Sequence, residues 1–244
     1  TRLAIRAGRG PLTGIDRVEL AYLRHLVASP SVVFFLMRWA GRLYLLDRVG
    51  GLALLRWVEG SEPLPVLPVL ARLAGADHPQ TAISLALARL AIASGSRVPT
   101  AIARYCSGGL YLNVGHLNLT DDTFAAVGSA PGLQRWVMIH DTIPLDHPDY
   151  SGQHAPERFR DAFAAALRAA DLVLSPSEAT ASHIHCWAGR LGQSPAIRVT
   201  PLGVMPPPVA GEPEAWLDPG ADYFLALGTI EPRKNIDRLL HAYE

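Results

Sequence analysis

Two basic residues follow a glycine turn near the end of the 244-residue chain, in the segment Gly228-Thr-Ile-Glu-Pro-Arg-Lys-Asn-Ile. An apolar run precedes the turn, and Arg233 and Lys234 stand where a helix is predicted to begin. Backbone N–H groups at a helix N-terminus and neighbouring cations together favour an anion such as a diphosphate. Ligands of open α/β sheets also bind at the carboxyl ends of strands. The alternative is a solvated basic turn without a ligand.

A histidine and an aspartate end a second apolar run, in Val137-Met-Ile-His-Asp-Thr-Ile-Pro-Leu. This position predicts that His140 and Asp141 point into the crevice where such sheets bind ligands. A metal site with His147 is an alternative because imidazole and carboxylate both ligate metals. No other motif completes that set, so we expect no metal. A purely structural hydrogen bond between His140 and Asp141 is the other alternative.

Two further segments contain polar residues whose pattern is less specific for a function. Ser177, followed by Glu178, is predicted to cap a helix after a strand. His183 and His185 are ligand types, but on a helix they face apart, so we do not expect zinc there. The chain has no GxxxxGK[ST] loop, GxSxG elbow or HExxH pair, and no GxGxxG after a strand. These absences argue against the commonest rival enzyme classes.

Strand-like and helix-like runs alternate along the chain, which predicts an α/β fold with a mostly parallel, Rossmann-like sheet flanked by helices. Three helices are predicted from apolar spacing and capping residues: Gly14–Leu26, one opening at Thr120, and Glu157–Ala170. Short apolar runs bounded by turn residues predict the strands Ser31–Met37, Leu110–Val114, Arg135–His140, Leu172–Ser175, Ile197–Thr200 and Tyr223–Leu227, with Leu3–Arg6 left to form a first strand.

A proline-rich segment, Val204–Gly220, has no periodic apolar face and predicts a linker. After it come one predicted strand and a helix that is still continuing at Glu244. One strand and one helix are too small to fold alone, so we expect a truncated second Rossmann-like domain with exposed apolar surface. The predicted divisions are a first domain at 1–203, the linker at 204–220 and the start of the second domain at 221–244.

The charge balance and the cysteine content limit the expected partners and the cellular compartment. Lys+Arg and Asp+Glu number 22 each, so no net charge favours nucleic acid, and we expect no such partner. Cys106 and Cys186 form no CxxC pattern, and the N-terminus lacks a signal-peptide pattern, which favours the cytoplasm. Arginines interrupt the apolar stretch Val32–Val58, so it should not span a membrane. It fits either buried core or peripheral contact with the inner face of a membrane.

The stretch Phe224-Leu-Ala-Leu-Gly-Thr-Ile-Glu-Pro-Arg-Lys-Asn-Ile-Asp-Arg-Leu-Leu-His-Ala-Tyr closely resembles the start of the donor domain in glycosyltransferase family four. Members are retaining enzymes with the two-domain GT-B fold. The resemblance implies that Lys234 grips the diphosphate of a nucleotide-sugar. Many members carry an arginine directly after the turn glycine, where this chain has Thr229, so we assign Arg233 as the substitute second cation.

Three other stretches look like the same family. Arg9-Gly-Pro-Leu-Thr-Gly-Ile-Asp-Arg-Val resembles its first glycine-containing loop, which implies that Gly14 allows close approach of the donor phosphates or the acceptor, with Arg17 meeting an anionic group. A plain turn and capped helix is the alternative.

The stretch around His140 resembles the motif whose histidine contacts the sugar. Ser175-Pro-Ser-Glu resembles a strand-to-helix turn of the family. Asn113 and His116 are candidates to line an acceptor pocket, or else to be satisfied within the core.

The resemblance implies transfer of a sugar from a nucleotide-diphosphate donor to a glycan or lipid-linked acceptor, in cell-surface polysaccharide synthesis. It implies no cofactor beyond the donor substrate. The family's glutamates near sugar and base would lie beyond Glu244, so we expect this chain alone to be inactive. The alternative is a non-enzymatic fragment acting as an acceptor-binding or interaction domain. A sugar epimerase of the same fold is a third, weaker reading.

Overall fold

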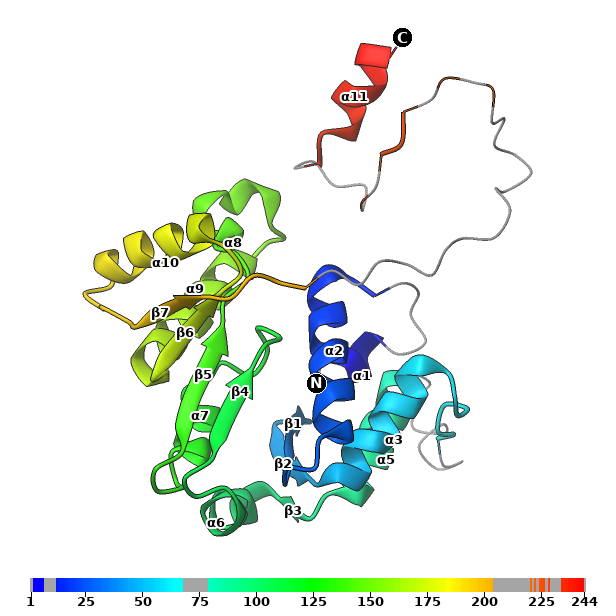
Figure 1. Ribbon diagram of the computed structural model, residues 1–244, viewed down its shortest axis with the longest axis vertical. Helices are drawn as coiled ribbons and strands as arrows, with labels where there is room; N and C mark the ends of the chain where they lie inside the picture. Colours follow the sequence, from blue (N-terminus) through cyan, green and yellow to red (C-terminus); the bar gives the residue numbers. More distant parts are fainter. Residues whose placement is uncertain are drawn as a thin grey trace.

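The protein is an α/β fold containing a four-stranded parallel sheet, as seen in a computed structural model (Figure 1). The structure describes residues 2–6, 12–67, 79–203, 220, 222, 224–226, 228 and 234–243. The parallel sheet has the order β4-β5-β6-β7, formed by Leu110–Asn113, Gln134–Met138, Leu172–Ser175 and Ile197–Val199. These strands confirm the predicted parallel sheet, with ends that differ by one or two residues.

Helices connect the parallel strands and cover one face of the sheet. α7 (Asp121–Val127) and α9 (Ala155–Ala169) lead into β5 and β6, and α10 (Glu178–Arg190) leads into β7. Their apolar side chains share one core cluster with the strands, in which Val137, Phe163 and Ile184 are almost fully buried. Thr120 caps α7 by accepting a hydrogen bond from the Thr123 amide, as predicted. The short α8 (Ile143–Asp146) follows β5.

The first part of the chain forms a separate antiparallel sheet with the order β1-β2-β3. Its strands are Phe35–Trp39, Arg42–Leu46 and Ala93–Ser94. The prediction of a parallel-sheet strand at Ser31–Met37 was therefore wrong in both bounds and pairing. Ala40 and Gly41 both have positive φ, 47° and 73°, and this two-residue turn folds the chain back into a hairpin.

Helices pack on this sheet and join it to the rest of the chain. α3 (Arg48–Glu59) begins after Asp47, whose side chain accepts hydrogen bonds from the Val49 and Gly50 amides. Met37, Leu46 and Leu54 belong to one buried cluster, and other apolar residues of the stretch Val32–Val58 pack partly buried against it. The other elements of this region are α2 (Gly14–Ala28), α5 (Pro79–Leu90), η1 (Gly95–Arg97) and α6 (Val98–Tyr105). None of the described helices has the length and apolarity needed to cross a membrane.

The predicted first strand at Leu3–Arg6 is instead part of a helix, α1 (Arg2–Arg6). Helical spacing brings Arg2 and Arg6 to the same side, where Arg2 Nε lies 2.6 Å and Arg6 Nε 3.4 Å from the carboxylate of Asp16. Leu3 and Ala4 are buried against the neighbouring helices. The two ion pairs and this burial explain why the segment is helical.

The end of the chain shows the exposed apolar surface that the sequence predicts. Phe224 and Leu225 are 80% and 74% exposed, and the described residues 224–226 contain no strand. Tyr223 and Leu227, the ends of the predicted strand, lie outside the described residues. α11 (Ile236–Tyr243) has no buried residue. The linker at 204–220 lies outside the described residues except for Gly220, so the domain divisions stay a prediction.

Candidate functional site

Three polar segments follow the parallel strands at the carboxyl edge of the sheet. His116 comes after β4, His140 and Asp141 after β5, and Ser177 after β6. Parallel strands end at a common edge, so these segments meet although they are far apart in sequence. The structure therefore brings together residues that the sequence placed on separate runs.

His116 and His140 form a linked pair at this edge. The His140 backbone amide donates to His116 Nε2 at 2.7 Å, and the two ring centroids lie 5.0 Å apart. His140 Nε2 lies 2.7 Å from the Val114 carbonyl oxygen and must donate to it, because a carbonyl only accepts. Neutral His140 then carries its proton on Nε2, which leaves Nδ1 as an acceptor for a hydroxyl donor.

The pKa of His116 is lowered from 6.5 to about 3. Burial is the main cause because it disfavours the charged imidazolium, and the neighbouring His140 adds to it. Neutral His116 keeps Nε2 free to accept from the His140 amide. The ring also contacts Phe159, with centroids 5.8 Å apart. His116 therefore positions His140, a role that the sequence did not reveal when it suggested that His116 lines a pocket or is satisfied within the core.

Asp141 lies just before the short helix α8 that follows β5. Its carboxylate accepts a hydrogen bond from the Ile143 amide at 3.1 Å. His140 bonds to Val114 instead of Asp141, so the suggested structural His–Asp hydrogen bond is absent from this part of the structure. Among the described residues, no group of three His, Cys, Asp or Glu side chains is placed to hold a metal.

A second polar cluster, centred on Asp146, holds the loop after β5 against α10. The Asp146 carboxylate accepts from Thr142 Oγ1 at 2.5 Å and from Trp187 Nε1 at 2.7 Å, and lies 3.1 Å from His183 Nδ1. Burial alone would raise the pKa of Asp146, but the hydrogen bonds from Thr142 and Trp187 outweigh it and lower the pKa. Sequence reasoning missed this cluster because its members come from different elements.

The start of α10 also supports the site. Ser177 caps the helix by accepting from the Thr180 amide, as predicted. Thr180 Oγ1 donates to the carbonyl oxygen of His140 at 3.4 Å. The cap of α10 and the backbone of His140 are therefore directly connected.

Asn113 is satisfied within the protein. Its amide nitrogen donates to the Tyr111 hydroxyl at 3.1 Å and to the Leu117 carbonyl at 2.8 Å. Its side-chain oxygen accepts from the Gly115 amide at 3.2 Å. These bonds fix the turn after β4, which favours the structural reading of Asn113.

Gly14 is the first residue of α2, as the sequence predicts. A Cβ atom added there would meet no atom of the described residues within 4 Å. Arg17, one turn in, is exposed and makes no ion pair with any described residue. Asp16 between them is fully buried and forms a reciprocal capping box with Thr13. Among the described residues, the exposed Arg17 is compatible with an anion at this end and equally with a plain capped helix.

Of the two predicted diphosphate ligands, Arg233 lies outside the described residues. Lys234 is exposed just before α11, and its side chain lies within 3.8 Å of the Cβ position of the turn residue Gly228. The described structure shows no contact between Lys234 and His140 or Gly14. The donor-phosphate residues and the residues at the sheet edge are therefore not brought together here.

Comparisons with known protein families, with curated proteins and with solved structures give no match.

Proposed function

We propose that the protein is a glycosyltransferase that moves a sugar from a nucleotide-diphosphate donor to a glycan or lipid-linked acceptor. The observation that carries the proposal is His140, held at the carboxyl edge of a parallel sheet with Nδ1 available as an acceptor. The sequence after Phe224, with Lys234 behind its glycine turn, supports it through its resemblance to glycosyltransferase family four. We infer retention of anomeric configuration from that resemblance.

The proposed chemistry depends on charge that develops on the leaving diphosphate. Lys234 and the backbone N–H groups at the start of its helix would stabilise that charge. His140 would orient the sugar by accepting a hydrogen bond from a sugar hydroxyl at Nδ1, while Val114 fixes its ring and His116 fixes its backbone. Asp141, the other candidate catalytic residue, lies next to His140 at the same edge of the sheet. The peripheral membrane contact and cytoplasmic setting expected from the sequence remain parts of this proposal.

His140→Gln is expected to lower kcat/KM by about 100-fold, because a glutamine amide keeps a donor for Val114 but loses the ring acceptor. The measurement is release of nucleoside diphosphate from a panel of nucleotide-sugars, which needs no known acceptor. This assay uses the protein extended through its natural reading frame. His25→Gln, at an exposed position on α2, is the matched control. A change smaller than about twofold for His140→Gln would remove His140 from the sugar site.

A further inference from the structure

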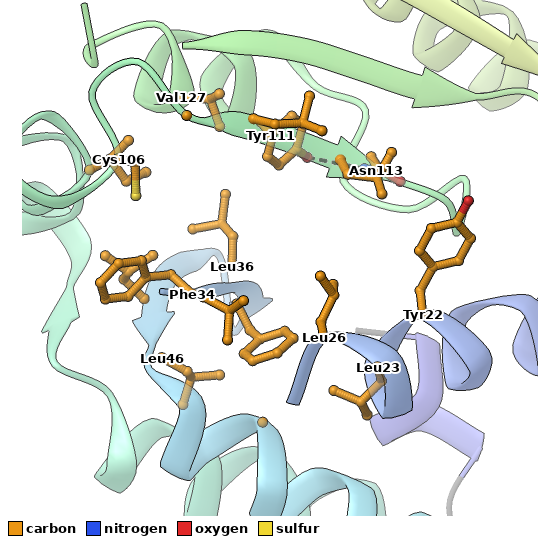
Figure 2. A pocket seen from close by; sticks show the side chains of 18 of the residues that line it. Tyr22, Leu23, Leu26, Phe34, Leu36, Leu46, Cys106, Tyr111, Asn113 and Val127 are labelled. Carbon is orange, nitrogen blue, oxygen red and sulfur yellow. Dashed lines mark hydrogen bonds between the residues drawn. The ribbon is translucent and has the colours of Figure 1, made fainter. Parts of the chain in front are cut away.

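An apolar cavity of about 470 Å³ lies between the two sheets, and we call it the slot (Figure 2). α2 forms one wall with Tyr22, Leu23 and Leu26, and the chain around β1 forms another with Phe34 and Leu36. The whole of β4 and its flanking residues, 109–115, lines the remaining side. The slot is therefore as long as the strand.

The edge of β4 that faces the slot has no strand partner among the described residues, because β4 pairs only with β5. The Gly109 carbonyl accepts from the Gln134 amide at 3.0 Å, on the β5 side. Backbone groups of successive residues alternate between the two edges of a strand. The N–H and C=O groups of Leu110 and Leu112 therefore point to the free edge, where an apolar neighbour would leave them unsatisfied.

The layers needed to cover one more strand are already present. On one face, Val18 and Tyr22 of α2 pack with Val114, Met138 and Leu174 of the parallel sheet. On the other face lie α7, α9 and α10, which share the other core cluster of the sheet. β1 is also an edge strand of its own sheet, and the chain around it lines the slot. One added strand would join the two sheets between these helices.

The polypeptide enters α1 at the carboxyl edge of β4. Glu19 of α2 lies against Gly115, directly after β4, so closely that a Cβ on Gly115 would meet Glu19 Oε1 at 1.6 Å. The Leu3 amide donates to the other carboxylate oxygen of Glu19 at 3.2 Å, and Leu3 itself lines the slot. A segment leading into α1 through the slot would therefore end at this edge and run parallel to β4.

We propose that the slot holds a β-strand of the protein's own polypeptide, the segment that leads into α1, paired in parallel with β4. Its side chains are apolar, because the walls on both faces are apolar. A lipid chain would fill the same volume but leave Leu110 and Leu112 without hydrogen-bond partners. With this strand in place, α2 covers one face of the enlarged sheet, and α7, α9 and α10 cover the other. The carboxyl edge beside His116 and His140 then becomes the topological switch point, which is where doubly wound sheets bind ligands.

Amide hydrogen exchange of Leu110 and Leu112, followed by NMR, tests this strand. The comparison is between residues 1–244 and the same protein extended upstream through its natural reading frame. The extension is expected to slow exchange of both amides by about tenfold or more, while Tyr111 and Asn113, which face β5, are protected in both proteins. Unchanged exchange at Leu110 and Leu112 would overturn the proposal.

A fused strand gives a second test that does not depend on the natural upstream sequence. About six residues alternating valine and isoleucine are placed before Thr1, and an equal length of glycine and serine is the control. Only the valine–isoleucine fusion should protect Leu110 and Leu112 and raise Tm. Equal protection by both fusions would contradict the proposal. Palmitate that shifts the methyl signals of Leu36 and Leu112 and blocks this protection would instead identify a lipid cavity and overturn it.

Discussion

Asp16→Ala is expected to lower the free energy of unfolding by about 3 to 5 kcal/mol, the usual cost of removing one partner from a buried ion pair. The Asp16 side chain is fully buried and lies 2.6 Å from Arg2 Nε. It also accepts from the Thr13 amide at 2.8 Å, which completes the capping box of α2. Burial alone would raise the pKa of Asp16, but the hydrogen bonds from Thr13 and the charge of Arg2 outweigh it and lower the pKa. Urea denaturation at neutral pH measures the loss.

Two variants sharpen this test. Asp16→Asn keeps an acceptor for the cap but loses the charge, so it should cost less than Asp16→Ala. Glu59→Gln removes the partly exposed pair between Arg24 and Glu59, 2.5 Å apart, and should cost no more than about 1 kcal/mol. If Asp16→Ala cost as little as Glu59→Gln, the ion pairs with α1 would not stabilise the fold.

His116 is expected to make the protein less stable as the pH falls from 6.5 toward 3. The unfolded chain binds a proton on this histidine near pH 6.5, whereas the folded protein binds it only near pH 3. Between these values the unfolded state holds the extra proton, so the free energy of unfolding falls by up to about 1.4 kcal/mol per pH unit. Above pH 6.5 this contribution is fully present and constant.

His116→Asn should remove this part of the pH dependence. Asparagine tolerates the positive φ of 58° at this position, and its side chain does not titrate. The variant should be less stable than the wild type at pH 7, because the contacts with Phe159 and His140 are lost, and the difference should shrink toward pH 4. His25→Asn controls for loss of an exposed imidazole. Parallel denaturation curves for wild type and His116→Asn at every pH would contradict the assigned pKa.

The parallel half of the fold was predictable from the sequence, whereas in the first half only the helix α2 was predicted correctly. β4 to β7 are short apolar runs separated by helical patterns, and buried parallel strands are expected to look that way. The hairpin was missed because it depends on the positive φ of Ala40, a residue type that gives no turn signal. α1 was missed because its helical form depends on ion pairs with Asp16, ten or more residues away.

The candidate site was predictable in position but not in detail. The end of a strand placed His140 and Asp141 at the sheet edge. The bonds that fix His140 come from His116 and Val114, and they follow from the pairing of β4 with β5. The hydrogen bonds of Asp146 with Trp187 and His183 likewise depend on how α8 packs near α10. Such long-range partners leave no local pattern in the sequence.

Calorimetric titration of a panel of nucleotide-sugars tests the proposed transferase most directly. The protein is extended through its natural reading frame and compared with Lys234→Ala, with Arg160→Ala on the exposed side of α9 as the control for loss of a cation. If the protein is such a transferase, the extended protein binds one nucleotide-sugar, Lys234→Ala weakens binding by at least about tenfold, and Arg160→Ala leaves binding unchanged. Failure of the extended protein to bind any nucleotide-sugar, or equal binding by Lys234→Ala, would contradict it.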